Sequence, residues 1–209
     1  MRVGAWILGA SLAGIVGCLA PFTWPDERAL PTVAVVVETP ADNALERAAE
    51  SLERGDFRSA VPQFRTYLLT FPEATVVRFQ LAELLYRLNQ PHDARTEFEL
   101  CVEEYAKPET PSPQSVQCHT RLMTLAEDRG DDFAENFHRG IGLFQLVKRW
   151  DADAERRDEV AAEQTLSRAL DAFTAAAALR PGETEVALYR SRVLERLGLP
   201  GGGSRFLAR

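Results

Sequence analysis

Residues 41–74 read ADNALERAAESLERGDFRSAVPQFRTYLLTFPEA, and they are the most informative segment for the fold. Its apolar residues recur every three to four positions, which is the periodicity of amphipathic helices. Gly55-Asp56 interrupts the pattern midway, and Pro72 closes it. The stretch therefore predicts two helices that reverse direction at Gly55 and pack against each other.

The same pattern returns 34 residues later, in residues 75–108. Five positions that pack or turn a helical hairpin recur at this spacing: Ala48 with Ala82, Gly55 with Asn89, Ala60 with Ala94, Phe64 with Phe98, and Tyr67 with Cys101. A fixed period of this length is typical of stacked helical repeats, in which each unit buries its apolar face against the next. The sequence therefore predicts an array of helical hairpins.

These spacings resemble the tetratricopeptide repeat family, in which small residues let two helices approach and a proline closes each unit. The resemblance implies an all-α, right-handed superhelix of about eight helices, with a concave face lined by the first helix of each pair. Residues 41–74 and 75–108 carry clear units, 109–150 a degenerate one and 151–198 a partial one. A flexible tail is expected over 199–209.

The N-terminal segment resembles the signal peptide of a bacterial lipoprotein. Met1-Arg2 supplies the positive charge, and an uncharged, largely apolar stretch follows. Ile15-Val16-Gly17-Cys18 resembles the lipobox, which implies removal of residues 1–17 and lipidation of Cys18. The alternative is an uncleaved single-span anchor. Residues 18–40 are rich in proline and predict a semi-extended tether, whose aliphatic run 33–37 either packs on the first helix or belongs to the tether.

Composition and charge limit the kinds of partner. The chain of 209 residues is 45% hydrophobic and 26% charged, ordinary values for a globular protein. A net charge of −7 argues against a nucleic-acid partner. Leu19 follows Cys18, and the resemblance then favours the outer membrane or the periplasmic face of the cell envelope. We expect protein partners and a membrane anchor.

No catalytic motif is present in the sequence, which lacks GxSxG, P-loop, HExxH and CxxC patterns. His92, His119 and His138 fall in separate predicted helices, whereas a zinc site needs three or four converging ligands. The sequence therefore predicts no catalytic residue, no metal, no cofactor and no enzymatic activity.

Cys101 and Cys118 have two interpretations. One lies late in the second hairpin and the other early in the next helix, so the two can meet across the interface between repeats. An exported protein experiences oxidising conditions, and a disulfide here would add about 3 kcal/mol of stability. The alternative is two buried free thiols that act as small apolar groups.

The concave face is the predicted partner groove. By template position, its residues are Leu45, Ala49, Leu52, Phe79, Glu83 and Tyr86, with Arg87 at the rim. Aromatic and aliphatic side chains beside an arginine suit an extended or helical peptide. The lysine and asparagine with which chaperone-binding relatives clamp a terminal carboxylate are absent, so that specificity is not implied. Alternatively, residues 33–37 cover Phe79 and Tyr86.

The sequence thus predicts a non-catalytic, envelope-anchored scaffold that binds protein partners in its concave groove. One alternative is a recruiting or regulatory subunit of a cell-envelope enzyme complex. The other is a structural protein that associates with itself through its first or last hairpin.

Overall fold

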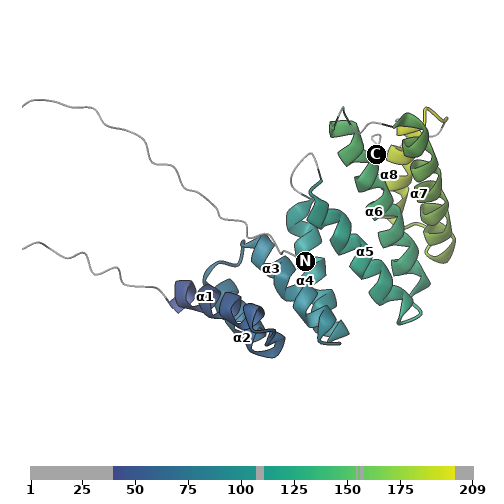
Figure 1. The fold of residues 1–209 in the computed structure, drawn as a ribbon. Coiled ribbons are helices and arrows are strands. Elements are labelled where there is room, and N and C mark those ends of the chain that lie inside the picture. The colour runs from purple at the N-terminus through teal and green to yellow at the C-terminus, as the bar shows by residue number, and fades with distance from the viewer. Residues whose placement is uncertain (1–39, 107–110, 154, 156–157, 201–209) are drawn as a thin grey trace, which may run out of the picture. The chain divides into compact units, whose positions relative to one another are not determined.

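The computed structural model describes residues 40–106, 111–153, 155 and 158–200. Within these residues it contains eight helices and no strand (Figure 1). The helices are α1 (Pro40–Glu53), α2 (Phe57–Thr70), α3 (Thr75–Arg87), α4 (Pro91–Tyr105), α5 (Pro113–Glu127), α6 (Asp132–Ala152), α7 (Glu159–Leu179) and α8 (Thr184–Arg196). The prediction of an all-α fold of about eight helices is confirmed. The predicted signal segment, Cys18, the aliphatic run 33–37 and residues 201–209 lie outside the described residues.

Each helix packs against the next one along the chain, from α1 to α8, and α6 also reaches α8 (Figure 1). Contacts between neighbours in sequence are the signature of a repeat array, in which each unit is stabilised by the units beside it. The fold is therefore an array of helical hairpins stacked in chain order. Among the described helices, none is both long enough and apolar enough to span a membrane.

The hairpin turns have the backbone conformation that the repeat alignment implies. Gly55 has φ of 74° and Asn89, its counterpart one repeat later, has φ of 55°. Gly130, between α5 and α6, has φ of 69°. Left-handed backbone at the end of a helix favours glycine, and asparagine is the commonest substitute. The alignment of Asn89 with Gly55 thus reflects the same chain reversal.

Side-chain caps begin four of the helices. Asp56, Ser112, Asp131 and Asp158 each accept a hydrogen bond from the backbone N–H three residues ahead, at 3.0 to 3.2 Å. Hydrogen bonds from Ser59 lower the pKa of Asp56. These caps satisfy amide donors that the helix itself leaves without partners.

Two apolar clusters form the interior of the described residues. The first joins α1 to α5 around Phe64, Leu81, Leu85 and Phe98. The second joins α6, α7 and α8 around Phe173 and its neighbours. Between the two clusters, α5 packs on α6 partly through buried polar side chains rather than through apolar ones. This polar interface adjoins the candidate site.

Candidate partner groove

A cavity of about 500 Å³ opens between α3 and α5. Phe79, Glu83 and Arg87, three of the residues expected in the groove, line it from α3. Its other wall comes from α5 and is formed by Gln117, Thr120 and Arg121. The sequence interpretation missed this second wall, because the third unit is degenerate and its groove positions have no clear template.

Glu83 and Arg121 form a bidentate ion pair across the cavity. The Nε and Nη2 atoms of Arg121 lie 2.8 and 3.0 Å from the two carboxylate oxygens of Glu83. The hydrogen bonds to Glu83 raise the pKa of Arg121. The same guanidinium lies over the ring of Tyr86, 4.5 Å from its centroid. Tyr86 is therefore covered by an arginine of α5 and contributes less open aromatic surface than predicted.

Arg87 is the cation that this cavity leaves available. Its side chain is exposed, and no ion pair engages it among the described residues. Phe79, which also lines the cavity, forms an edge-to-face contact with the buried Phe98 at a centroid distance of 6.2 Å. The cavity thus combines a half-buried aromatic side chain, fixed by the core, with a free guanidinium.

The three predicted residues of α1 do not line this cavity. Leu45 and Leu52 are half-buried against the first apolar cluster, and Ala49 is exposed. The structure therefore brings together Phe79, Glu83 and Arg87 of the predicted set.

A second cavity, of about 260 Å³, lies where α5, α6 and α7 meet. Its walls are mainly apolar, with polar groups at the edge; the lining residues are Val116, Thr120, Met123, His138, Arg139, Gly142, Leu143, Leu146 and Arg168. Thr120 also lines the α3–α5 cavity, so the two cavities are adjacent along α5. The sequence did not predict this cavity, since the pairing of helices between residues 131 and 165 had no template.

A series of hydrogen bonds connects α5 to α6 and ends at His138, which lines the second cavity. Ser115 Oγ donates to Gln145 Oε1 at 2.7 Å, and Gln145 Nε2 lies 3.2 Å from His119 Nε2. His119 Nδ1 lies 3.2 Å from His138 Nδ1. Because the amide nitrogen of Gln145 can only donate, we assign the proton of His119 to Nδ1, from which it is donated to His138 Nδ1. His138 then carries its own proton on Nε2.

His119 and His138 are both neutral near pH 7. Burial lowers the pKa of His119 to about 3 and that of His138 to about 4. The sequence placed these residues in separate helices, and the structure brings their rings together. Among the described residues, no cluster of three or more histidine, cysteine or acidic side chains is arranged to bind a metal ion.

Cys101 of α4 and Cys118 of α5 are buried free thiols that approach each other across the α4–α5 interface. A hydrogen bond between them, together with burial, raises the pKa of Cys118. The cysteines are therefore placed as the sequence interpretation requires for either a disulfide or a pair of thiols. The disulfide itself stays a prediction.

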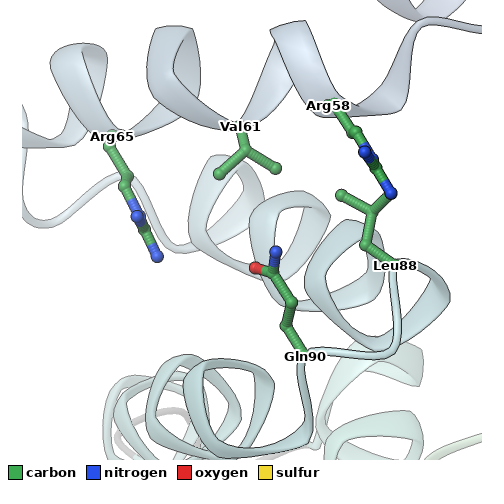
Figure 2. A pocket seen from close by; sticks show the side chains of 5 residues that line it. All are labelled: Arg58, Val61, Arg65, Leu88 and Gln90. Carbon is green, nitrogen blue, oxygen red and sulfur yellow. The ribbon is translucent and has the colours of Figure 1, made fainter.

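A third cavity, of about 440 Å³, lies outside the predicted groove (Figure 2). Arg58, Val61 and Arg65 of α2 face Leu88 and Gln90 at the turn between α3 and α4. Arg65 forms an ion pair of 2.7 Å with Asp93, while Arg58 is exposed and forms no ion pair with a described residue.

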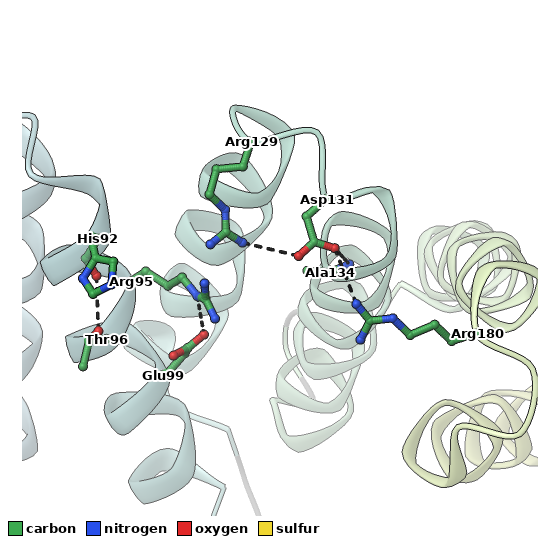
Figure 3. Close-up of polar contacts among 8 residues, drawn as sticks. All are labelled: His92, Arg95, Thr96, Glu99, Arg129, Asp131, Ala134 and Arg180. Carbon is green, nitrogen blue, oxygen red and sulfur yellow. Dashed lines mark hydrogen bonds and ion pairs between the residues drawn. The ribbon is translucent and has the colours of Figure 1, made fainter.

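Asp131 connects the ends of three helices (Figure 3). It caps α6 by accepting from the Ala134 N–H at 3.0 Å, and it pairs with Arg129 at 3.5 Å and Arg180 at 4.0 Å. Arg180 of the α7 C-terminus also lies 3.8 Å above the Phe133 ring. These contacts fix the start of α6, and with it the helix that carries His138 and Arg139.

No protein-family model matches this chain, and no curated protein matches its sequence. Solved structures do match it. One crystal structure of a MamA protein is 15% identical, covers 77% of this chain and 84% of its own, and gives a TM-score of 0.45. MamA of Desulfovibrio magneticus RS-1 is 13% identical, covers 76% of this chain and 86% of its own, and gives a TM-score of 0.42. We draw no conclusion about partners from similarities of this degree.

Proposed function

We propose that this protein is a non-catalytic scaffold that binds a segment of a partner protein in the groove between α3 and α5. The observation that carries this proposal is the cavity of about 500 Å³ in which the half-buried Phe79 stands beside the free guanidinium of Arg87. Aromatic and arginine side chains next to each other are the common energetic centres of protein interfaces.

The electrostatics of the groove favour binding over catalysis. Its carboxylate, Glu83, is held in a bidentate pair by Arg121 and so is not available as a general base. The remaining lining groups, Gln117 and Thr120, donate and accept hydrogen bonds but do not titrate near neutral pH. Such a set positions a polypeptide backbone and its side chains.

We also propose that the scaffold is exported and lipid-anchored at Cys18, on the outer membrane or the periplasmic face of the envelope. The support is the sequence resemblance of residues 1–18 to lipoprotein signals. Labelling with a radioactive fatty acid in the bacterial host tests this proposal, with Cys18→Ser beside the native chain. Equal labelling of the two proteins would contradict it.

Affinity capture after crosslinking in native membranes tests the groove. We would compare the tagged full chain with the Arg87→Glu/Gln117→Glu variant, in which both altered side chains are exposed and the core is untouched. Arg47→Glu/Arg190→Glu is the matched control, since it changes exposed residues of α1 and α8. A partner that is retained by the control and lost by the groove variant supports the proposal. The same proteins captured by all three would overturn it.

A further inference from the structure

We propose that the α5–α6–α7 cavity is a second subsite of the same groove, and that it takes a large apolar side chain flanked by a carboxylate of the partner segment. This inference rests on the proposed function, since it assumes that a polypeptide lies along α5.

The walls of the cavity select an apolar side chain. Val116 and Met123 of α5 face Leu143 and Leu146 of α6, and all four side chains are only half-buried. Gly142 also lines the cavity, at a point where α6 lies close to α5: a Cβ there would meet His119 Cβ at 3.4 Å. When a partner covers apolar surface that is partly exposed to water in the free protein, burial of that surface stabilises the complex.

The charges at the edge of the cavity select a carboxylate. Arg168 of α7 is exposed and forms no ion pair with a described residue, while Arg139 bonds to Glu135 of its own helix. Arg87 is a further free cation, at the adjacent cavity. The whole chain has a net charge of −7, so this cationic rim has the opposite sign to the average surface. An acidic partner segment is electrostatically complementary to it.

His138 adds a directional donor at the same edge. Its Nδ1 accepts from His119, so its proton lies on Nε2, for which the described residues offer no acceptor. The ring lines the cavity, and a neutral N–H group held in place by packing is suited to a carboxylate oxygen. Arg168 supplies charge and His138 supplies orientation.

The two cavities share Thr120, which makes one continuous binding path along α5. A single segment can therefore contact Arg87 at one end and Arg168 at the other. The second cavity would then account for which partner is chosen, because it combines a partly open apolar pocket with oriented polar groups.

Binding of short labelled peptides to the full chain tests this subsite. The probe is a fluorescein-labelled peptide of about nine residues, with phenylalanine between two glutamates in a glycine–serine context. Two matched peptides replace the phenylalanine by serine or the glutamates by lysine. We expect the acidic phenylalanine peptide to bind with a Kd below about 1 mM, and each replacement to weaken binding about tenfold or more.

Protein variants locate the site. Arg168→Glu is expected to weaken the acidic peptide about tenfold, whereas Arg190→Glu, an exposed arginine of α8, leaves the Kd unchanged. Nitrogen NMR of the His138 ring is expected to show a shift of Nε2 when the peptide is added to the native chain. Loss of that shift in Arg168→Glu would place both residues at one site.

Three outcomes would overturn the inference. The first is no binding of the acidic peptide at about 1 mM protein. The second is equal weakening by Arg168→Glu and Arg190→Glu, which indicates a general effect of charge. The third is weakening by Arg87→Glu but not by Arg168→Glu, which would leave the α3–α5 groove as the binding site and the proposed function intact. Membrane capture with the groove variant tests that function separately.

Discussion

Gly140 of α6 lies so close to Phe173 of α7 that a Cβ on Gly140 would come within 2.6 Å of the Cε1 atom of the ring. Phe173 is fully buried, and its ring stacks on the ring of Tyr189 in α8 at a centroid distance of 5.7 Å. The missing side chain at Gly140 therefore sets the approach of α6 to α7. Because protein interiors are close-packed, the position of Tyr189 depends on it as well.

We predict that Gly140→Ala destabilises the protein by about 1–3 kcal/mol, the usual cost of overpacking a filled core. The added methyl must displace the Phe173 ring, which is fully buried and stacked on Tyr189. This cost exceeds the gain of up to about 1 kcal/mol that alanine brings to a helix interior. Urea unfolding of the full chain, followed by circular dichroism, measures the difference.

Gly142→Ala is the matched control, two residues further along the same helix. Its Cβ would meet His119 Cβ at 3.4 Å, close to an ordinary contact. We expect no loss of stability there, or a small gain. Equal destabilisation by both variants would show that flexibility of the helix, rather than the contact with Phe173, explains the effect.

The contrast between α1–α4 and α6–α8 shows which features of the fold can be predicted from the sequence. Gly55 and Asn89 recur at the repeat period because both stand at left-handed turns, so the first two hairpins were predictable. The contact between Phe173 and Gly140 was not predictable. That contact joins helices separated by a charged segment of irregular length, for which the repeat pattern gives no register.

The candidate site divides in the same way. Phe79 and Arg87 were predictable, since one helix face of a clear repeat fixes both positions. The Glu83–Arg121 pair joins residues 38 positions apart, and nothing in a single sequence distinguishes that partner from other arginines. The His119–His138 contact depended on the packing of α5 on α6, which the degenerate third unit did not define.

We predict that the His119–His138 contact makes folding sensitive to acid. Both pKa values are ordinarily 6.5 and fall to about 3 and about 4 in the folded chain, chiefly through burial. Between pH 6.5 and about pH 4, the unfolded chain therefore binds more protons than the folded chain does. Stability from this source is therefore complete above pH 6.5 and is lost as the pH falls toward 4, by about 1.4 kcal/mol per pH unit for each histidine.

Urea unfolding at pH 7 and pH 5 measures this loss. The charged groups that act on His138 come from three parts of the chain: Glu99 and Arg95 of α4, Arg129 at the end of α5, and Asp131 at the start of α6. Two of these groups raise the pKa of His138 and two lower it, and burial is the largest cause of the lowered value. We expect His138→Gln to reduce the difference between the two pH values, and His92→Gln, which alters an exposed histidine, to leave it unchanged. An undiminished difference in His138→Gln would contradict the assignment.

We predict that Cys101 and Cys118 resist alkylation in the native protein and react once it is unfolded. Both thiols are inaccessible, and the raised pKa of Cys118 keeps it protonated. Peptide mapping without reductant shows whether Cys101 and Cys118 are free or bonded, separately from Cys18. If the peptides that contain Cys101 and Cys118 are recovered as a crosslinked pair, the disulfide forms in the native protein and the free-thiol interpretation is wrong.

The last prediction concerns Arg196, which ties the end of α8 to the two preceding helices. Its guanidinium bonds to both carboxylate oxygens of Asp151, at 3.0 and 2.8 Å, and to Glu159 at 2.9 and 3.2 Å. The bonds to Asp151 and Glu159 raise its pKa. Lysine keeps the charge but cannot reproduce the planar fork.

We expect Arg196→Lys to cost about 1 kcal/mol and to loosen α8 selectively, because a partly exposed ion pair contributes little to global stability. Hydrogen exchange of the α8 amides should increase severalfold while that of α3 and α4 stays constant. Arg192→Lys serves as the control, since Arg192 lies over the ring of Tyr189 at 5.6 Å and forms no ion pair with a described residue. Unchanged exchange in α8 of Arg196→Lys would show that packing on Phe173, and not the ion pairs, holds this helix to the array.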